Sequence, residues 1–229
     1  MFIGHFGLAL GAKTAQPRVS LGTLFLAAQF ADLLWPTLLL LGLERVAIQP
    51  GITHMTPLNF EHYPISHSLL LQLVWGAALG LGYGLLRRNW RGAALVALLV
   101  PSHWLLDLLM HRPDLPLFPG HSPLLGLGLW NHPLAAQLLE AVTFFGGLAS
   151  YLRHTAARNK AGVYALWSLV AFLLLIQVGN LLGPAPTSVT ALAWAGQLQW
   201  LIVLWGYWAD RNRAAVPAKA PAALPQLAP

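Results

Sequence analysis

Long apolar stretches recur along most of the chain, and they predict helices that cross a membrane. A transmembrane helix needs about 20 mainly apolar residues to cross a hydrocarbon core about 30 Å thick. Residues 2–12 are apolar but shorter than that, so they predict a half-inserted or interfacial helix. The pattern therefore predicts an all-α fold, a polytopic membrane helical bundle with a short N-terminal half-helix and six spans, at 19–43, 67–87, 91–111, 134–153, 161–182 and 188–208.

The hydrophobic pattern ends abruptly near residue 210. From there the sequence is rich in proline, which removes backbone donors and breaks helices. We therefore expect residues 1–209 to form a single integral membrane domain and residues 210–229 to form a disordered cytoplasmic tail.

Composition supports the membrane interpretation and gives the chain an orientation. Charged residues make up only 9% of the sequence, against about a quarter in soluble domains. The net charge of +6 would suggest nucleic acid on a soluble protein, but here basic residues mark the cytoplasmic ends of helices, so no nucleic-acid partner is expected. With both termini in the cytoplasm, the outer connections 44–66 and 112–133 carry only Arg45 and Arg112. The remaining basic residues fall inside: Lys13, Arg18, Arg87, Arg88, Arg91, Arg153, Arg158, Lys160, Arg211, Arg213 and Lys219.

Ionisable side chains within membrane spans are costly and are therefore candidates for function. The third span carries His103, Asp107 and His111, each four residues after the last, so the three share one helix face. Because the chain has no cysteine, a metal would be held by histidine and carboxylate, which suit zinc, with manganese or iron as alternatives. The competing interpretation is a set of membrane histidines satisfied by local hydrogen bonds.

Other spans place polar side chains at a similar height. Counted from the basic residues at about 1.5 Å per residue, Asp32, His103, Asp107 and Glu140 lie about 18–24 Å up, in the outer half of the bundle. At the outer entry to the second span, Ser66 is expected to cap a helix that starts at His67. The further ligand candidates are His5, Asp32, His62 and His67, and Glu140 is the candidate catalytic residue.

Four short elements resemble the YdjM-like family of bacterial membrane-bound metal-dependent hydrolases. The counterparts here are Gly4-His5, Ala31-Asp32-Leu33-Leu34-Trp35-Pro36, His62-Tyr63-Pro64-Ile65-Ser66-His67-Ser68, and Ser102-His103 with Asp107. Order and spacing agree over roughly residues 4–119, and the last two spans add nothing to the match. Leu34 stands where the family has a second aspartate and Tyr63 where it has an arginine, which makes His111 a candidate replacement ligand.

The resemblance implies a metal-dependent hydrolase of the bacterial cytoplasmic (inner) membrane. The family is distantly similar to zinc-dependent phospholipase C and P1-type nucleases, which implies phosphoester hydrolysis by analogy of fold and motif. A site in the outer half of the bilayer suits a lipid or lipid-linked substrate. Metal-activated water would attack it, with Glu140 orienting or deprotonating that water.

Two other functions use the same residues. A transporter or ion-coupled carrier would arrange them along a pathway near the midplane, although the internal repeat typical of such proteins is not visible. A non-catalytic membrane protein would use them for a structural metal. Paired histidines also serve haem, but the carboxylates between them argue against that ligation.

Overall fold

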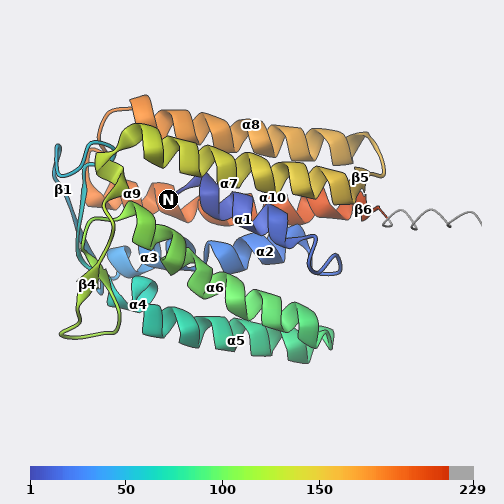
Figure 1. Ribbon diagram of the computed structural model, residues 1–229, viewed down its shortest axis with the longest axis horizontal. Coiled ribbons are helices and arrows are strands. Elements are labelled where there is room, and N and C mark those ends of the chain that lie inside the picture. The colour runs from blue at the N-terminus through green and yellow to red at the C-terminus, as the bar shows by residue number, and fades with distance from the viewer. Residues whose placement is uncertain (217–229) are drawn as a thin grey trace, which may run out of the picture.

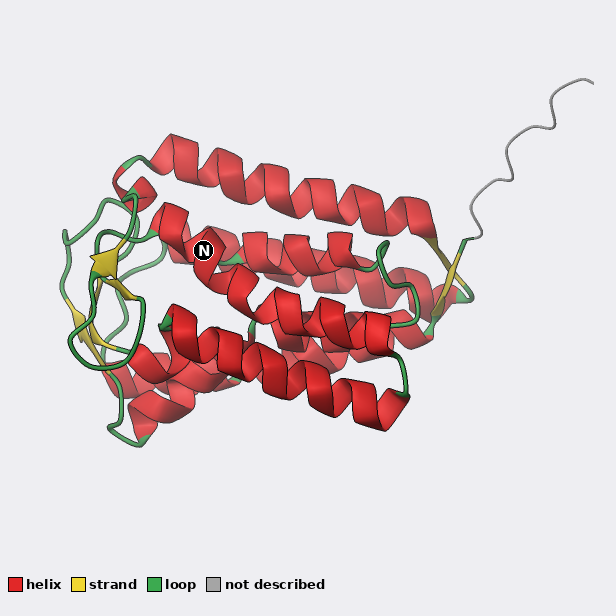
Figure 2. Ribbon diagram, turned by 60° about the horizontal axis from the view of Figure 1, so that its bottom comes forward, coloured by secondary structure: helices red, strands yellow, loops and turns green. Residues whose placement is uncertain are grey.

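The chain folds into the predicted polytopic bundle of α-helices. The computed structural model describes residues 1–216, so positions 217–229 of the predicted tail lie outside the described residues. The helices run lengthwise and short strands lie at both ends of the bundle (Figures 1 and 2). In chain order the elements are α1 (Ile3–Ala12), α2 (Leu21–Ala28), α3 (Phe30–Leu40), β1 (Arg45–Ile48), β2 (Leu58–His62), α4 (Pro64–His67), α5 (Leu69–Arg87), α6 (Trp90–Met110), β3 (Leu115–Pro116), β4 (Leu124–Leu125), a 3₁₀ turn (Leu129–Asn131), α7 (Pro133–His154), β5 (Thr155–Ala157), α8 (Lys160–Leu182), α9 (Val189–Gln197), α10 (Gln199–Arg211) and β6 (Arg213–Ala215).

The predicted spans correspond to helices of the bundle. Within residues 1–216, five stretches are long and apolar enough to cross a membrane, namely α5, α6, α7, α8 and the consecutive pair α9 and α10. The first predicted span is a pair, α2 and α3, that bends by 57° at Gln29. Several helices begin at side chains that accept a hydrogen bond from a backbone N–H of the first turn, such as Ser20, Asn89 and Asn159. Hydropathy thus predicts where spans lie, while the bend in the first span is new.

The N-terminal helix α1 lies inside the bundle rather than at the membrane surface. Most of its residues are buried, and it packs against α7 and α2. Contact with α7 is so close that a Cβ at Gly147 would collide with the carbonyl oxygen of Gly7. Small residues permit such close approach of helix backbones in membranes. The expected interfacial helix is therefore an interior helix, held by glycine on both sides.

The basic connections gather at one end of the bundle, opposite the strands β1 to β4. The connections α1–α2, α5–α6 and α7–α8 and the end of α10 lie at the same end in Figure 1. Met1 is buried within the bundle, and its amino group lies 2.7 Å from a carboxylate oxygen of Asp107, while the side of the membrane on which the termini lie stays a prediction. The other end of α1, at Lys13, joins the basic end.

The ordered domain extends past the predicted boundary at residue 209. Helix α10 continues to Arg211, and β6 pairs antiparallel with β5. Lys13 forms a 2.7 Å ion pair with Asp210, and Arg213 donates to the backbone oxygens of Thr155 and Gly162. These contacts tie the end of α10 to α1 and to the α7–α8 connection, so residues 210–216 belong to the folded domain.

Docking of α1 against α7 can be tested with two neighbouring glycines. We expect Gly147→Leu to lower the free energy of unfolding by at least about 1–3 kcal/mol, because the added side chain meets the Gly7 backbone. Gly146→Leu is the matched control, since a Cβ there meets nothing within 4 Å. Thermal unfolding in detergent measures both, and equal stability of the two variants would contradict the close contact.

Orientation can be tested by labelling, because the natural chain has no cysteine. His121, between β3 and β4, and Ala156, in β5, are exposed and belong to segments at opposite ends of the bundle. Because neither residue is a lysine or arginine, His121→Cys and Ala156→Cys leave the count of these residues unchanged. In intact bacterial spheroplasts, an impermeant maleimide should label the cysteine at 121, and label the one at 156 only after permeabilisation. The reverse pattern would invert the proposed orientation.

Candidate metal centre

Six of the predicted ligand residues converge in one buried cluster: His5, Asp32, His67, His103, Asp107 and His111. Four separate elements or their ends supply them, which are α1, the first turn of α3, α4 and the C-terminal half of α6 with its cap. Ligand atoms of His5, His103 and Asp107 lie within 4.8 Å of one another, and so do those of Asp32, His67 and His103. Buried His/Asp groups that could hold a metal ion are therefore present at the predicted place.

Asp107 lies at the centre of the cluster. Its Oδ2 is 3.1 Å from Nε2 of His103, 4.0 Å from Nε2 of His67 and 3.9 Å from Nε2 of His111. Its Oδ1 is 3.1 Å from Nε2 of His5 and 2.7 Å from the Met1 amino group. A single carboxylate thus faces four imidazoles and an amine.

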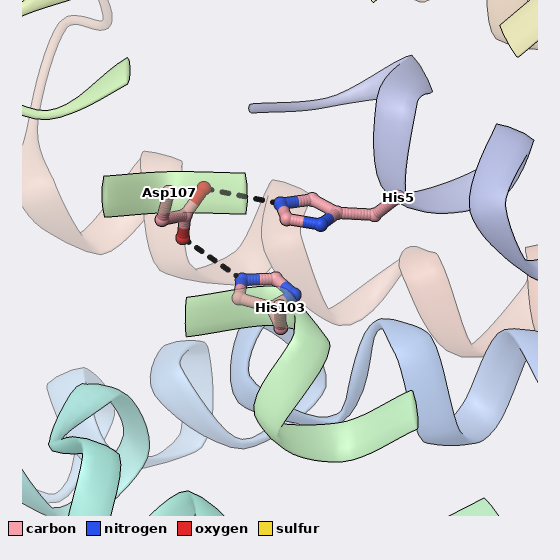
Figure 3. Close-up of side chains that lie close together, drawn as sticks. All are labelled: His5, His103 and Asp107. Atoms are coloured by element: carbon pink, nitrogen blue, oxygen red, sulfur yellow. Dashed lines mark hydrogen bonds and ion pairs between the residues drawn. The ribbon is translucent and has the colours of Figure 1, made fainter. Parts of the chain in front are cut away.

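His5 and His103 form a pair of stacked rings. Their centroids are 3.7 Å apart and the ring planes differ by 6°, although one residue comes from α1 and the other from α6. Each ring aims at a different oxygen of Asp107 (Figure 3). The docking of α1 in the interior is what brings His5 to this position.

The orientation of His103 is set by the break between α2 and α3. Its Nδ1 lies 2.8 Å from the carbonyl oxygen of Ala28, the last residue of α2. A carbonyl only accepts, so the Nδ1 carries the proton, and in the neutral ring Nε2 presents a lone pair. That Nε2 is buried and makes no hydrogen bond, although Asp107 Oδ2 is only 3.1 Å away. Two acceptor atoms that face each other call for a cation or an added proton beside them.

Nδ1 of His111 is also held by an acceptor, which here is a side chain beyond the end of α6. This nitrogen lies 2.9 Å from Asp114 Oδ1, and the hydroxyl of Tyr63 donates to the same oxygen at 3.0 Å. Burial lowers the pKa of His111, an effect that the hydrogen bond to Asp114 only partly opposes. Burial, and then the charge of Asp114, raise the pKa of the Tyr63 hydroxyl, which stays protonated. The other ring nitrogen of His111, Nε2, lies 3.9 Å from Asp107 Oδ2.

Asp32 completes the cluster from α3. Its Oδ1 lies 3.5 Å from Nε2 of His67 and 3.7 Å from Nε2 of His103. Its side chain is 22% exposed, whereas those of His67, His103 and Asp107 are at most 3% exposed. The cluster is thus closed on most sides and most accessible at Asp32.

The spacing of these atoms fits a divalent metal. Zinc bound at about 2.0–2.1 Å in a tetrahedral site has ligand atoms about 3.3 Å apart. The separations of 3.1, 3.5 and 3.7 Å between histidine Nε2 and carboxylate oxygen atoms are close to that value. Second-shell acceptors on Nδ1, as seen for His103 and His111, are typical of metal-binding histidines.

Two candidate residues do not join the cluster. His62 is exposed at the end of β2, where it pairs with Arg45 of β1. Glu140 is buried, but its two carboxylate oxygens accept from the backbone N–H groups of Phe2 and Gly4 at 2.9 and 2.8 Å. Glu140 therefore anchors the first turn of α1, which carries His5, and the interpretation as a catalytic base lacks geometric support.

Sequence reasoning missed the residues that hold the histidines. Asp114 lies in the loop that follows α6, where a solvated side chain is ordinary, yet it is 6% exposed and contacts His111. Ser66 is not the expected helix cap, because Ser68 accepts from Leu71 at the start of α5 while Ser66 contacts Glu44 and His67. A useful signal for Asp114 would have been its spacing of three residues after a candidate ligand.

Comparisons of the chain with protein-family models, with curated proteins and with solved structures find no match. The function must therefore be argued from the geometry of the cluster.

Proposed function

We propose that this membrane protein is a metal-dependent hydrolase that acts on a phosphoester in a lipid or lipid-linked substrate. One observation carries the proposal: histidine Nε2 atoms converge on two carboxylates, while acceptors hold the Nδ1 atoms of His103 and His111 from behind. Such preorganised nitrogen and oxygen ligands suit zinc first, and manganese or iron as alternatives.

A divalent metal bound there would supply a water of lowered pKa and positive charge for the oxyanion that develops. The protein residues have separate tasks around it. His67, His103 and Asp107 are the buried ligands, while Asp32 is the cluster member that an incoming substrate or water meets first. Its carboxylate would be the group available to accept a proton from the attacking water, a role the sequence had suggested for Glu140.

A lipid or lipid-linked substrate is supported by where the cluster lies. It lies among α1, α3, α4 and α6, and α6 is itself long and apolar enough to span a membrane. Long helices of the bundle expose large apolar residues, such as Leu81 on α5, Leu98 on α6 and Val142 on α7. A substrate with an apolar tail in the bilayer can present its polar head at this level without leaving the membrane.

Metal content provides a direct test of the proposal. We expect purified wild-type protein, prepared without chelators, to contain about one or two divalent ions per chain by elemental analysis. His103→Ala and Asp107→Ala should each lose most of that metal because they remove central ligands. His62→Ala is the matched control, since this histidine lies outside the cluster, and it should bind metal like the wild type.

Thermal unfolding of each variant separates ligand loss from misfolding. Wild-type protein without stoichiometric metal would sink the proposal. Metal that survives both central substitutions would place the centre elsewhere in the chain.

Turnover of a phosphoester provides a separate test. In detergent micelles, the protein should hydrolyse bis(4-nitrophenyl) phosphate, lose that activity with 1,10-phenanthroline and regain it with added zinc or manganese. Asp107→Ala should lower the rate at least about 100-fold, because several kcal/mol of transition-state stabilisation depend on the metal. His62→Ala should stay within about twofold. Stoichiometric metal without phosphoester turnover would instead favour a carrier or a structural metal.

A further inference from the structure

Glu44 is a buried carboxylate outside the ligand cluster, and it accepts hydrogen bonds from the short helix α4. It is 2% exposed and follows α3 in the chain. Its Oε1 accepts from the backbone N–H groups of Ile65 and Ser66 at 2.7 and 2.8 Å. Its Oε2 accepts from the Ser66 hydroxyl at 2.6 Å. Three donors from two consecutive residues thus converge on one side chain.

The Ser66 hydroxyl connects this carboxylate to a metal-ligand candidate. Ser66 Oγ lies 2.7 Å from Nδ1 of His67. A hydroxyl has one proton, and here it is directed at Glu44. The hydroxyl must then accept from His67, so that the imidazole carries its proton on Nδ1. The opposite nitrogen, Nε2, presents its lone pair to Asp32 at 3.5 Å and Asp107 at 4.0 Å.

We propose that Glu44 is a positioning residue that acts through the Ser66 hydroxyl to fix the tautomer and ring orientation of His67. This inference rests on the proposed metal site and deepens it, because it identifies the group that holds Nδ1 of His67. Nδ1 of His103 is held by a backbone carbonyl and Nδ1 of His111 by Asp114. Glu44 with Ser66 supplies the matching acceptor for His67.

The chain offers a way to separate this positioning role from the holding of α4. Ser66→Ala removes only the hydroxyl and keeps both backbone hydrogen bonds to Glu44. Ser68→Ala is the matched control: Ser68 is equally buried and caps α5, and its hydroxyl accepts from the Leu71 N–H, whereas that of Ser66 contacts His67. Ser66→Thr restores the hydroxyl.

The experiment measures two quantities on each variant. Zinc affinity, from competition with a chromophoric chelator, should fall about 10–100-fold in Ser66→Ala, the usual effect of removing an outer-shell partner. It should stay within about twofold in Ser68→Ala and recover in Ser66→Thr. In the metal-free protein labelled with ¹⁵N-histidine, the His67 signal, assigned with His67→Gln, should report a proton on Nδ1 in the wild type and lose that preference in Ser66→Ala.

The outcomes keep this inference distinct from the proposed function. Wild-type zinc affinity and an unchanged His67 signal in Ser66→Ala would overturn the positioning role and leave Glu44 as a structural anchor of α4. If the wild type binds no zinc, the proposed function fails, while the ¹⁵N signal of the metal-free protein still decides whether Ser66 fixes the tautomer.

Discussion

The fold depends on the cost of burying one carboxylate, that of Asp107, in the membrane bundle. An ionised carboxylate in apolar surroundings is stable only when it is paired and hydrogen-bonded. Asp107 lies on α6, and the groups that face it come from α1 and the Met1 amino group before it, from α4, and from α6 and its end. Without α1 in the interior, Oδ1 would lose both of these partners, His5 and the Met1 amino group. Burial of α1 is thus electrostatic as well as steric in origin.

Helix ends and the break between α2 and α3 provide polar groups that orient the candidate ligands. The break at Gln29 leaves the carbonyl of Ala28 available for His103, and Asp32 falls in the first turn of the helix that follows. His67 ends α4, one residue before the cap of α5, and His111 follows the last residue of α6. Irregular backbone at membrane depth is tolerated where it is buried in protein or lines a cavity. Here helix ends and breaks bring the ligands of separate helices to one point.

The sequence predicts the spans and the ligand types because both follow from local spacing. Hydropathy locates the long helices, and the four-residue spacing of His103, Asp107 and His111 predicts a shared face, which the structure confirms for the cluster. The contacts of Glu140 depend on how α1 packs against α7, and those of Asp114 depend on the path of the loop after α6. Neither leaves a periodic signal. Tyr63 is a related case, because its hydroxyl donates to Asp114, which is 51 residues away in the sequence.

The distribution of acidic residues unites these observations. The chain has seven Asp and Glu residues, all within the described part, and a membrane bundle has little reason to bury them without function. Asp32 and Asp107 belong to the cluster, Asp114 holds His111, Glu44 reaches His67 through Ser66, and Glu140 anchors the helix that carries His5. Only Glu61, which is exposed, and Asp210, which pairs with Lys13, serve elsewhere. Five carboxylates therefore act on one centre, directly or through one or two intervening residues. This surrounding shell is consistent with the proposed metal site, because outer-shell partners fix the tautomer and orientation of metal-binding histidines.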